Sequence, residues 1–307
     1  MPVKFVFLLL PDVHLMDLAG PDQTINEAID YGADFEIAYC GADADIISSA
    51  GLGIGRQQHF SGMDQNDIDY LIIPGTRMKY LLSDEFKNNT ALLDWIKDCH
   101  RRGVRLVSIC SGAFVLGEAG LLDGISCTTH FKQTRNLQQY YPRALVKENV
   151  LFVEEKNIYT SAGIASGIDL MLHIVEQLKG SYFAHKVARE LVIYNRRDGH
   201  QEQLSAFMQF RNHVHSGIHN SQDFIAEHIE KKHHLADLAE VANMSERNFT
   251  RTFKKETGTT VIAYINSIRR EIIGKLLQHK DLSYTQIAGK VGLESEKQVR
   301  RILNSRT

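Results

Sequence analysis

Apolar and polar positions change period repeatedly over the first 195 residues. Short continuous apolar runs, as expected for strands covered on both faces, alternate with segments whose apolar residues recur at helical spacing. The runs are residues 4–10, 35–40, 68–75 and 104–110, a hairpin is predicted over 151–162, and the helical segments are 17–32, 88–103 and 167–180. This alternation predicts an α/β domain with a doubly wound, mostly parallel sheet.

The pattern changes near residue 195, and every later segment has helical periodicity. These segments are residues 221–231, 235–242, 246–256, 261–279, 284–290 and 296–303. With 307 residues, the chain is long enough for two domains that each bury a core. We therefore predict an α/β domain over 1–195, a linker over 196–220 and an all-α domain over 221–307.

Residues 235–258 carry two short helical segments separated by a two-residue turn. Leucines and alanines form one apolar face of the first segment, and Ser245 is a favourable N-cap for the second. In the second segment Phe249 and Phe253 are four residues apart and are expected to face inward, which leaves the basic residues outside. This arrangement is typical of a helix-turn-helix unit, whose second helix enters the major groove of DNA.

Residues 283–303 repeat this pattern, with Val299 and Leu303 at the positions of the two phenylalanines. Capping boxes of the form Ser-x-x-Gln begin both of its predicted helices. Between the units, residues 261–279 predict a helical rod of about 28 Å at 1.5 Å per residue. Successive major grooves on one face of B-DNA are about 34 Å apart, so such a rod could hold two recognition helices near adjacent grooves.

Charge is distributed unevenly along the chain. The formal net charge is −2, but residues 247–307 hold 13 Lys and Arg against 5 Asp and Glu, a balance of +8. The residues before them therefore carry −10. A basic segment behind an acidic body indicates a polyanionic partner, and with the helix-turn-helix pattern this partner is double-stranded DNA.

The four cysteines show no C-x-x-C spacing, which favours a cytoplasmic protein without a disulfide framework or a zinc site. The N-terminal apolar run is interrupted by Pro11 and Asp12, and no segment reaches the roughly 20 apolar residues that span a bilayer. His213, His215 and His219 have no carboxylate or cysteine beside them at ligand spacing, so a solvated or capping role is favoured. We expect no membrane association, no metal and no cofactor.

The stretch VRLVSICSGAFVLGEAGLLDG, residues 104–124, places Cys110 at the end of a predicted strand and directly before a predicted helix. Ligands of open α/β sheets bind at such strand ends. Unpaired N–H groups and the helix dipole favour a thiolate there, so we expect the pKa of Cys110 to lie below its usual value of about 8.5. The alternative is a small buried cysteine that only packs.

Other residues are predicted to converge on the same crevice. Gly75 and Thr76 follow another strand, where their N–H groups could face a bound carbonyl or oxyanion. Asp17 follows the first strand and could contribute a carboxyl group. Ser111 is a small neighbour that a tight turn at the cysteine requires. His130 ends a further short strand, where a hydrogen-bonded core role is the alternative to ligand binding.

Several motifs, taken in order, resemble the ThiJ/PfpI branch of the class I glutamine amidotransferase-like superfamily. They are DLAGP, IIPG, SICSGAFVLGEAGLLDG, TTHF and IYTSAGIASGIDLMLHIVEQL, and the resemblance covers about residues 3–195. It implies a flavodoxin-like, often dimeric domain, with Cys110 as the reactive residue and Asp17 as the acid that contacts it. Ser108 stands where the family's elbow usually begins with glycine, and no His–Glu pair for glutamine hydrolysis stands out.

Residues 221–303 resemble the AraC/XylS type of DNA-binding domain, in which a helix such as AYINSIRREIIGKLL joins two helix-turn-helix units. Arg and Asn or Gln match purine edges in the major groove, whereas other basic residues hold phosphates. The predicted base readers are Arg247, Asn248, Arg251, Lys297, Gln298 and Arg301. The predicted phosphate contacts are Lys254, Lys255, Arg269 and Arg270, and Arg300 completes the predicted DNA-binding set.

Two functions remain open at this point. The first is a transcription regulator, a homodimer whose N-terminal domain senses an unknown small-molecule effector, dimerises or does both, while its C-terminal domain binds a promoter. The second is a cysteine-dependent hydrolase or hydratase in which Cys110 attacks an electrophilic carbon and Asp17 shuttles a proton. The complete and repeated DNA-binding pattern favours the first, because the cysteine site lacks a convincing base.

Overall fold

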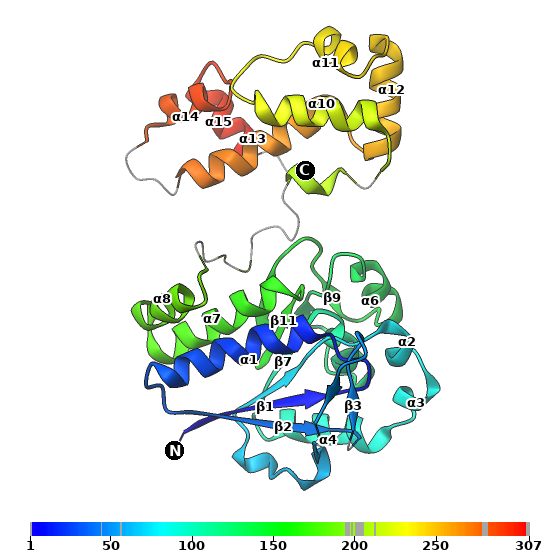
Figure 1. Cartoon of the computed structure of the whole chain (residues 1–307), viewed down its shortest axis with the longest axis vertical. Coiled ribbons are helices and arrows are strands. Elements are labelled where there is room, and N and C mark those ends of the chain that lie inside the picture. Colours follow the sequence, from blue (N-terminus) through cyan, green and yellow to red (C-terminus); the bar gives the residue numbers. More distant parts are fainter. Residues whose placement is uncertain are drawn as a thin grey trace. The chain divides into compact units, whose positions relative to one another are not determined.

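The computed structural model divides the chain into two compact units, Met1–Gln203 and Leu204–Thr307 (Figure 1). It describes all residues except 1, 44, 56, 194–196, 198, 200–205, 212, 278–281 and 305–307, and the side chain of residue 208. The predicted linker over 196–220 therefore lies partly outside the described residues. Helices α9 (Ala206–Gln209) and α10 (Ser216–Glu227) begin inside that range, so helical structure starts before the predicted residue 221.

A seven-stranded sheet forms the centre of the N-terminal unit, in the order β10-β11-β7-β6-β1-β2-β5. Its neighbouring strands are parallel except β10 and β11, which form the predicted hairpin. The strands are β1 (Val3–Leu9), β2 (Phe35–Gly41), β5 (Gln58–His59), β6 (Tyr70–Ile73), β7 (Arg105–Ile109), β10 (Phe152–Glu155) and β11 (Ile158–Ser161). The predicted doubly wound parallel sheet is confirmed.

Helices cover both faces of this sheet. One face carries α1 (Leu15–Asp30), α7 (Ala165–Lys179) and α8 (Ser181–Glu190). The other carries α2 (Met78–Leu81), α3 (Asp84–Lys87), α4 (Thr90–Arg101), α5 (Ala113–Glu118) and α6 (Thr134–Tyr140). Successive residues of β1, such as Phe7 and Leu8, enter the two different apolar clusters. This two-sided burial is the reason that β1 is apolar along its length.

Several elements lie outside the sequence prediction. They are the two-residue strands β3 (Ile46–Ile47), β4 (Gly53–Ile54), β5 and β9 (Leu145–Val146), together with α2, α3, α6, α8 and α9. The short strand predicted to end at His130 is β8 (Ser126–Cys127), which ends three residues earlier. A two-residue strand contains a single period of two residues, so no alternation of apolar and polar residues can repeat within it. The four-residue helices α2, α3 and α9 span about one turn, so the sequence shows no helical repeat of apolar residues there.

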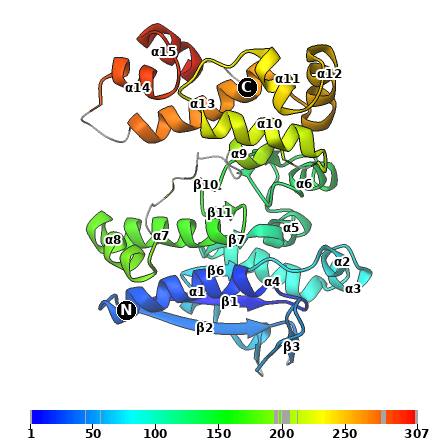
Figure 2. The same ribbon diagram turned by 45° about the horizontal axis from the view of Figure 1, so that its top comes forward.

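The C-terminal unit continues with α11 (Leu235–Val241), α12 (Glu246–Thr257), α13 (Val261–Leu277), α14 (Tyr284–Lys290) and α15 (Glu296–Asn304). Within this unit α13 runs between α12 and α15 (Figure 2). Ser245 accepts a hydrogen bond from the N–H of Asn248 at the start of α12, and Ser283 forms a capping box with Gln286 at the start of α14. None of the described helices is long and apolar enough to cross a lipid bilayer.

Two apolar clusters support the two halves of this unit. The first surrounds Phe249, Phe253 and Tyr264, whose rings meet edge to face. The second is smaller and aliphatic, and it contains Val299 and Ile302. Ile302 is buried whereas Leu303, the residue predicted to face inward, is only partly buried. The inward face of α15 therefore follows the i, i+3 spacing rather than the predicted i, i+4 spacing.

Replacing Phe253 with alanine should destabilise the C-terminal unit. Phe253 is fully buried, and truncation of such a phenylalanine costs about 3–5 kcal/mol. In hydrogen exchange read by mass spectrometry over a guanidinium series, peptides from 216–277 should lose protection at lower denaturant, while those from β1 and β7 should not change. Thr250→Ala, at an exposed position of the same helix, is the control. Identical midpoints for the two variants would contradict the expectation.

Candidate functional site

Cys110 lies at a sharp turn between β7 and α5. Its φ of 56° is in the left-handed region, which is uncommon for a residue with a side chain and marks a strained turn. Gly112 allows this turn to approach β6, since a Cβ at that position would lie 2.2 Å from the carbonyl oxygen of Ile73. The structure therefore has a strand-to-helix elbow at the carboxyl end of β7, with Cys110 on it.

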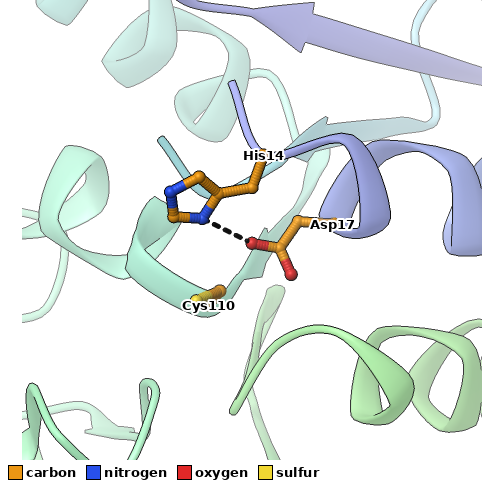
Figure 3. A group of neighbouring side chains, drawn as sticks. All are labelled: His14, Asp17 and Cys110. Atoms are coloured by element: carbon orange, nitrogen blue, oxygen red, sulfur yellow. Dashed lines mark hydrogen bonds and ion pairs between the residues drawn. The ribbon is translucent and has the colours of Figure 1, made fainter. Parts of the chain in front are cut away.

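His14 and Asp17 lie beside this cysteine (Figure 3). His14 directly precedes α1, and Asp17 is in the first turn of that helix. Oδ2 of Asp17 is 3.2 Å from Nδ1 of His14, and Oδ1 accepts a 2.6 Å hydrogen bond from the N–H of Ile164. One ligand atom each from His14, Asp17 and Cys110 lies within 4.8 Å of the other two. The structure thus brings the two predicted residues together and adds a histidine.

Two glycines let the surrounding loops close on this group. A Cβ on Gly75 would lie 2.4 Å from Oδ2 of Asp17, and one on Gly163 would lie 2.8 Å from Sγ of Cys110. Gly163 also has a φ of +97°, which residues with a side chain rarely adopt. The loops after β6 and β11 are therefore in direct contact with the site, and neither position has room for a side chain.

Thr76 and Ser111 bond to each other across the strand ends. The N–H of Thr76 donates to Oγ of Ser111 at 2.9 Å, and that hydroxyl donates to the carbonyl oxygen of Thr76 at 2.7 Å. The hydroxyl of Thr76 donates to the carbonyl oxygen of Pro11. The prediction that the N–H of Thr76 faces an oxyanion is wrong, because this donor already ties the β6 loop to the elbow.

Burial raises the pKa of the Cys110 thiol, and the neighbouring Asp17 carboxylate raises it further. A hydrogen bond from the backbone of Ser111 lowers it by less. Only 6% of Cys110 is exposed, and the helix behind it has six residues, so the helix dipole does not offset the lost hydration. The lowered pKa expected from the sequence is wrong, and the thiol is protonated near pH 7.

His130 lies at the margin of this group. Burial lowers the pKa of His130, and its Nδ1 accepts a 3.3 Å hydrogen bond from the N–H of Lys132. It is therefore a neutral, hydrogen-bonded histidine near pH 7. His14 is the neighbour that sequence reasoning missed. Its position three residues before Asp17, at the start of a helix, is the signal that places the two side chains on one side.

The outer face of α12 is basic and exposed. A surface groove on it is lined by Arg247, Thr250, Arg251, Lys254 and Lys255. Nη2 of Arg251 donates a 3.1 Å hydrogen bond to Oδ1 of Asn248, so two predicted base readers lie side by side. All five predicted DNA contacts of the first unit are accessible to solvent.

The second helix-turn-helix unit, formed by α14 and α15, also has a basic outer face, but its side chains are held by more contacts within the protein. Lys297, Arg300 and Arg301 of α15 are exposed. The guanidinium of Arg300 bonds to Glu296 and lies over the ring of Tyr284, 4.5 Å from its centroid. Oε1 of Gln298 accepts a 2.8 Å hydrogen bond from the N–H of Glu294, so the amide oxygen of this predicted base reader is engaged within the helix start.

Arg269 and Arg270 of α13 brace the domain from within. Nη2 of Arg269 donates to the carbonyl oxygens of Lys231 at 3.3 Å and Gly292 at 3.2 Å, and Nε of Arg270 donates to that of Ile302 at 3.0 Å. These bonds connect the joining helix to the loop before α11 and to the second unit. Both guanidinium groups therefore have structural partners where phosphate contacts were predicted.

The linker histidines order the turn before α10. The rings of His213 and His219 stack with centroids 4.2 Å apart, and Nε2 of His219 bonds to the carbonyl oxygen of His213 at 2.8 Å. The N–H of His215 donates to Nδ1 of His213. Within the described part of the chain, the histidine, cysteine and acidic side chains whose ligand atoms converge are those of His14, Asp17 and Cys110.

Two family models match the chain, the DJ-1/PfpI family over residues 3–177 and a helix-turn-helix domain over residues 238–307. The HTH-type transcriptional regulator CdhR of Pseudomonas aeruginosa is 27% identical over 304 residues, which cover 96% of this chain and 86% of that protein. The HTH-type transcriptional regulator GlxA of Rhizobium meliloti is 28% identical over 81% of this chain and 75% of its own length. The isonitrile hydratase of Pseudomonas putida is 31% identical over 62% of this chain and 78% of the hydratase.

Solved structures share the fold. A ThiJ/PfpI family protein from Pseudomonas syringae has a TM-score of 0.57 at 22% identity and covers 80% of this chain and 92% of that one. An AraC family transcriptional regulator from Pseudomonas putida has a TM-score of 0.53 at 24% identity and covers 62% of this chain and 100% of that one. Both likenesses support the fold described above.

Asp17→Asn should lower the pKa of Cys110. The substitution removes the carboxylate charge, the second cause of the raised pKa, while burial remains, so the thiolate forms at a lower pH. The rate of iodoacetamide alkylation at Cys110, followed against pH by mass spectrometry, should rise at a lower pH than in the unchanged protein. Asp30→Asn, at the far end of the same helix, is the matched control. A pH profile that does not move, or moves upward, would show that Asp17 does not oppose the thiolate.

Proposed function

The chain belongs to the DJ-1/PfpI family and is a DNA-binding transcriptional regulator of the AraC type, and we propose that it binds promoter sequences through both helix-turn-helix units under control of its N-terminal domain. The groove on α12 carries this proposal, because its four basic side chains are exposed over a fully buried Phe249 and Phe253. Arg and Asn can pair with purine edges, and the adjacent lysines can neutralise phosphates.

The joining helix supports simultaneous use of both units. α13 has 17 residues, which corresponds to a length of about 25 Å at 1.5 Å per residue. Hydrogen bonds from Arg269 and Arg270 hold α13 against the second helix-turn-helix unit. Two readers held by such a rod can enter adjacent major grooves, about 34 Å apart, on one face of a duplex. Arg301 and Lys297 would then read the second site.

The Cys110 group is proposed as the sensing site, and α7 as the element that responds to it. Gly163 touches Cys110, and the N–H of Ile164 bonds to Asp17. α7 begins at the next residue, Ala165. A ligand or a chemical change that moves Sγ would therefore act on the residues that precede this helix, because a Cβ on Gly163 would lie only 2.8 Å from Sγ.

The first turns of α7 also hold the segment that leads to the C-terminal unit. Asp169 is buried, and its carboxylate accepts hydrogen bonds from Nε and Nη2 of Arg197 at 3.0 and 2.5 Å. Two residues later, the carbonyl oxygen of Gly199 accepts from the N–H of Leu151 at 3.0 Å. The first turns of α7 therefore contact the Cys110 site at their start and Arg197, in the segment after α8, through Asp169. This arrangement supports effector control of DNA binding.

We also propose that the protein acts as a homodimer in the cytoplasm. Met16, Phe131 and Ile164 are exposed apolar residues next to site residues in the sequence, and a second copy could cover them. The four cysteines are free, as expected in a reducing compartment. Light scattering of the full chain distinguishes the dimer from a monomer, whose mass is 34.8 kDa.

A second candidate function is catalysis at Cys110. The elbow geometry and the 31% identity to an isonitrile hydratase favour it. The raised pKa of Cys110 disfavours it, because the thiolate is the attacking species. Turnover of an isonitrile by the purified protein that is lost in Cys110→Ser would establish this function. No detectable turnover at high enzyme concentration would exclude it.

Arg251→Ala should weaken sequence-specific binding by about 1–3 kcal/mol, or roughly 5- to 150-fold, at one base pair. Fluorescence anisotropy with a duplex selected from a random library measures the effect, and binding to all sequences should fall steeply with salt. Lys275→Ala removes a cation that is paired with Glu271 outside the groove and is the control. Equal losses for selected and scrambled duplexes would overturn base reading by Arg251.

Arg197→Ala should uncouple the sensing site from DNA binding without changing basal affinity. In the unchanged protein, alkylation of Cys110 by iodoacetamide stands in for effector occupancy and should change the Kd for the selected duplex. The change should be reduced in Arg197→Ala, because the Asp169 contact is lost. Arg143→Ala breaks an exposed ion pair to Asp123 on the same unit and is the matched control. An undiminished response in Arg197→Ala would exclude this route.

A further inference from the structure

His14, Asp17 and Cys110 offer the donor atoms of a transition-metal site. Imidazole nitrogen, carboxylate oxygen and thiolate sulfur are the ligands of protein-bound zinc, at about 2.0–2.3 Å. Donors of one tetrahedral ion at such bond lengths are about 3.3–3.7 Å apart. Nδ1 of His14 and Oδ2 of Asp17 are 3.2 Å apart, and the sulfur lies within 4.8 Å of both. The group is therefore spaced for a shared ion after small adjustments.

The two oxygens of Asp17 have different surroundings. Oδ1 is held by the N–H of Ile164, while Oδ2 is directed to His14 (Figure 3). A backbone donor on one oxygen orients a carboxylate that binds an ion through the other. Asp17 is fully buried, and within the described residues no ion pair joins it to a lysine or arginine, while the ring of His14 lies beside its Oδ2. A buried carboxylate of this kind gains from a cation beside it.

The site has an entrance on one side. The His14 side chain is 36% exposed, while Asp17 is enclosed and Cys110 nearly so. Gly75 packs against Asp17 and Gly163 against Cys110, and neither position has room for a Cβ. An ion held by the three residues would therefore keep its fourth position toward solvent, beside His14, where a water molecule completes a tetrahedron.

We propose that Nδ1 of His14, Oδ2 of Asp17 and Sγ of Cys110 bind one thiophilic divalent cation of the zinc type, and that this cation is the effector of the regulator. The second clause rests on the proposed function. On binding, the thiol loses its proton to solvent and its sulfur forms the metal bond. The remaining proton of His14 resides on Nε2, and no oxidant or reductant takes part.

The cation would act on Gly163 and Ile164, the residues that lead from the Cys110 site into α7. Sγ of Cys110 already touches the Gly163 position, and Asp17 holds Ile164. Bound to one cation, the three donor atoms would each lie about 2 Å from it. Sγ would then move relative to Gly163, and Oδ2 would exchange its contact with Nδ1 of His14 for a bond to the cation. Both changes act on Gly163 and Ile164, the two residues that precede α7. Asp169 of α7 in turn holds Arg197.

Cobalt(II) binding tests the site directly. The full chain, cleared of metal with a chelator, is titrated with cobalt(II) chloride and followed by absorption. We expect a sulfur-to-cobalt charge-transfer band that saturates at one equivalent and is reversed by zinc. Cys110→Ser should abolish the band, and His14→Gln or Asp17→Asn should weaken binding by about 10-fold or more. Far-ultraviolet circular dichroism confirms that each variant is folded.

Two controls exclude other binding places. His219→Gln alters the linker histidines and Cys127→Ala removes another buried cysteine, and both should retain the band. A missing band in the unchanged protein, a stoichiometry other than one, or a band that persists in Cys110→Ser would overturn the site.

The effector role is read separately from DNA affinity. Anisotropy with the selected duplex, in zinc and in chelator, should differ by about 5-fold or more for the unchanged protein and should not differ for Cys110→Ser. Cobalt binding with unchanged DNA affinity would overturn the effector clause and leave the site intact. Failure to bind the selected duplex in either condition would instead count against the proposed function, whatever the cobalt titration shows.

Discussion

Close approach of three backbone segments at Cys110 is the constraint on which the N-terminal unit depends. The elbow holds the cysteine at a positive φ, and the loops after β6 and β11 approach so closely that Gly75 and Gly163 have no room for a side chain. Asp17 closes the arrangement through its bond to the N–H of Ile164. Strain at the cysteine is therefore maintained by contacts from distant parts of the chain, which is how strained positions persist at functional sites.

The overall architecture could be predicted because its signals are local. Apolar runs of strand length identified the central strands, and Ser245 and Ser283 marked helix starts that the structure confirms within a residue or two. The sequence does not reveal most of the two-residue strands, because a period of two residues does not repeat within them. The inward residue of α15 was assigned to Leu303 instead of Ile302, since both are apolar and the sequence alone does not fix the rotation of a short helix.

The site was predicted only in part, for physical reasons that lie outside local patterns. Cys110 and Asp17 were found from their positions after strands, whereas His14 was not, because a histidine before a helix has many ordinary roles. The pKa of Cys110 was predicted in the wrong direction, since burial depends on the whole fold. Arg269 and Arg270 were assigned to phosphates because the carbonyl groups that they bond to are invisible in a sequence.

The bracing of the second helix-turn-helix unit by α13 has a consequence for how such a regulator can evolve. Its small aliphatic cluster and the bonds from Arg269 and Arg270 make the orientation of α15 a property of the joining helix. Substitutions on the inner side of α13 would therefore change how α15 is held within the C-terminal unit. If α15 reads DNA as proposed, the preferred sequence would then change through residues that make no contact with a nucleotide.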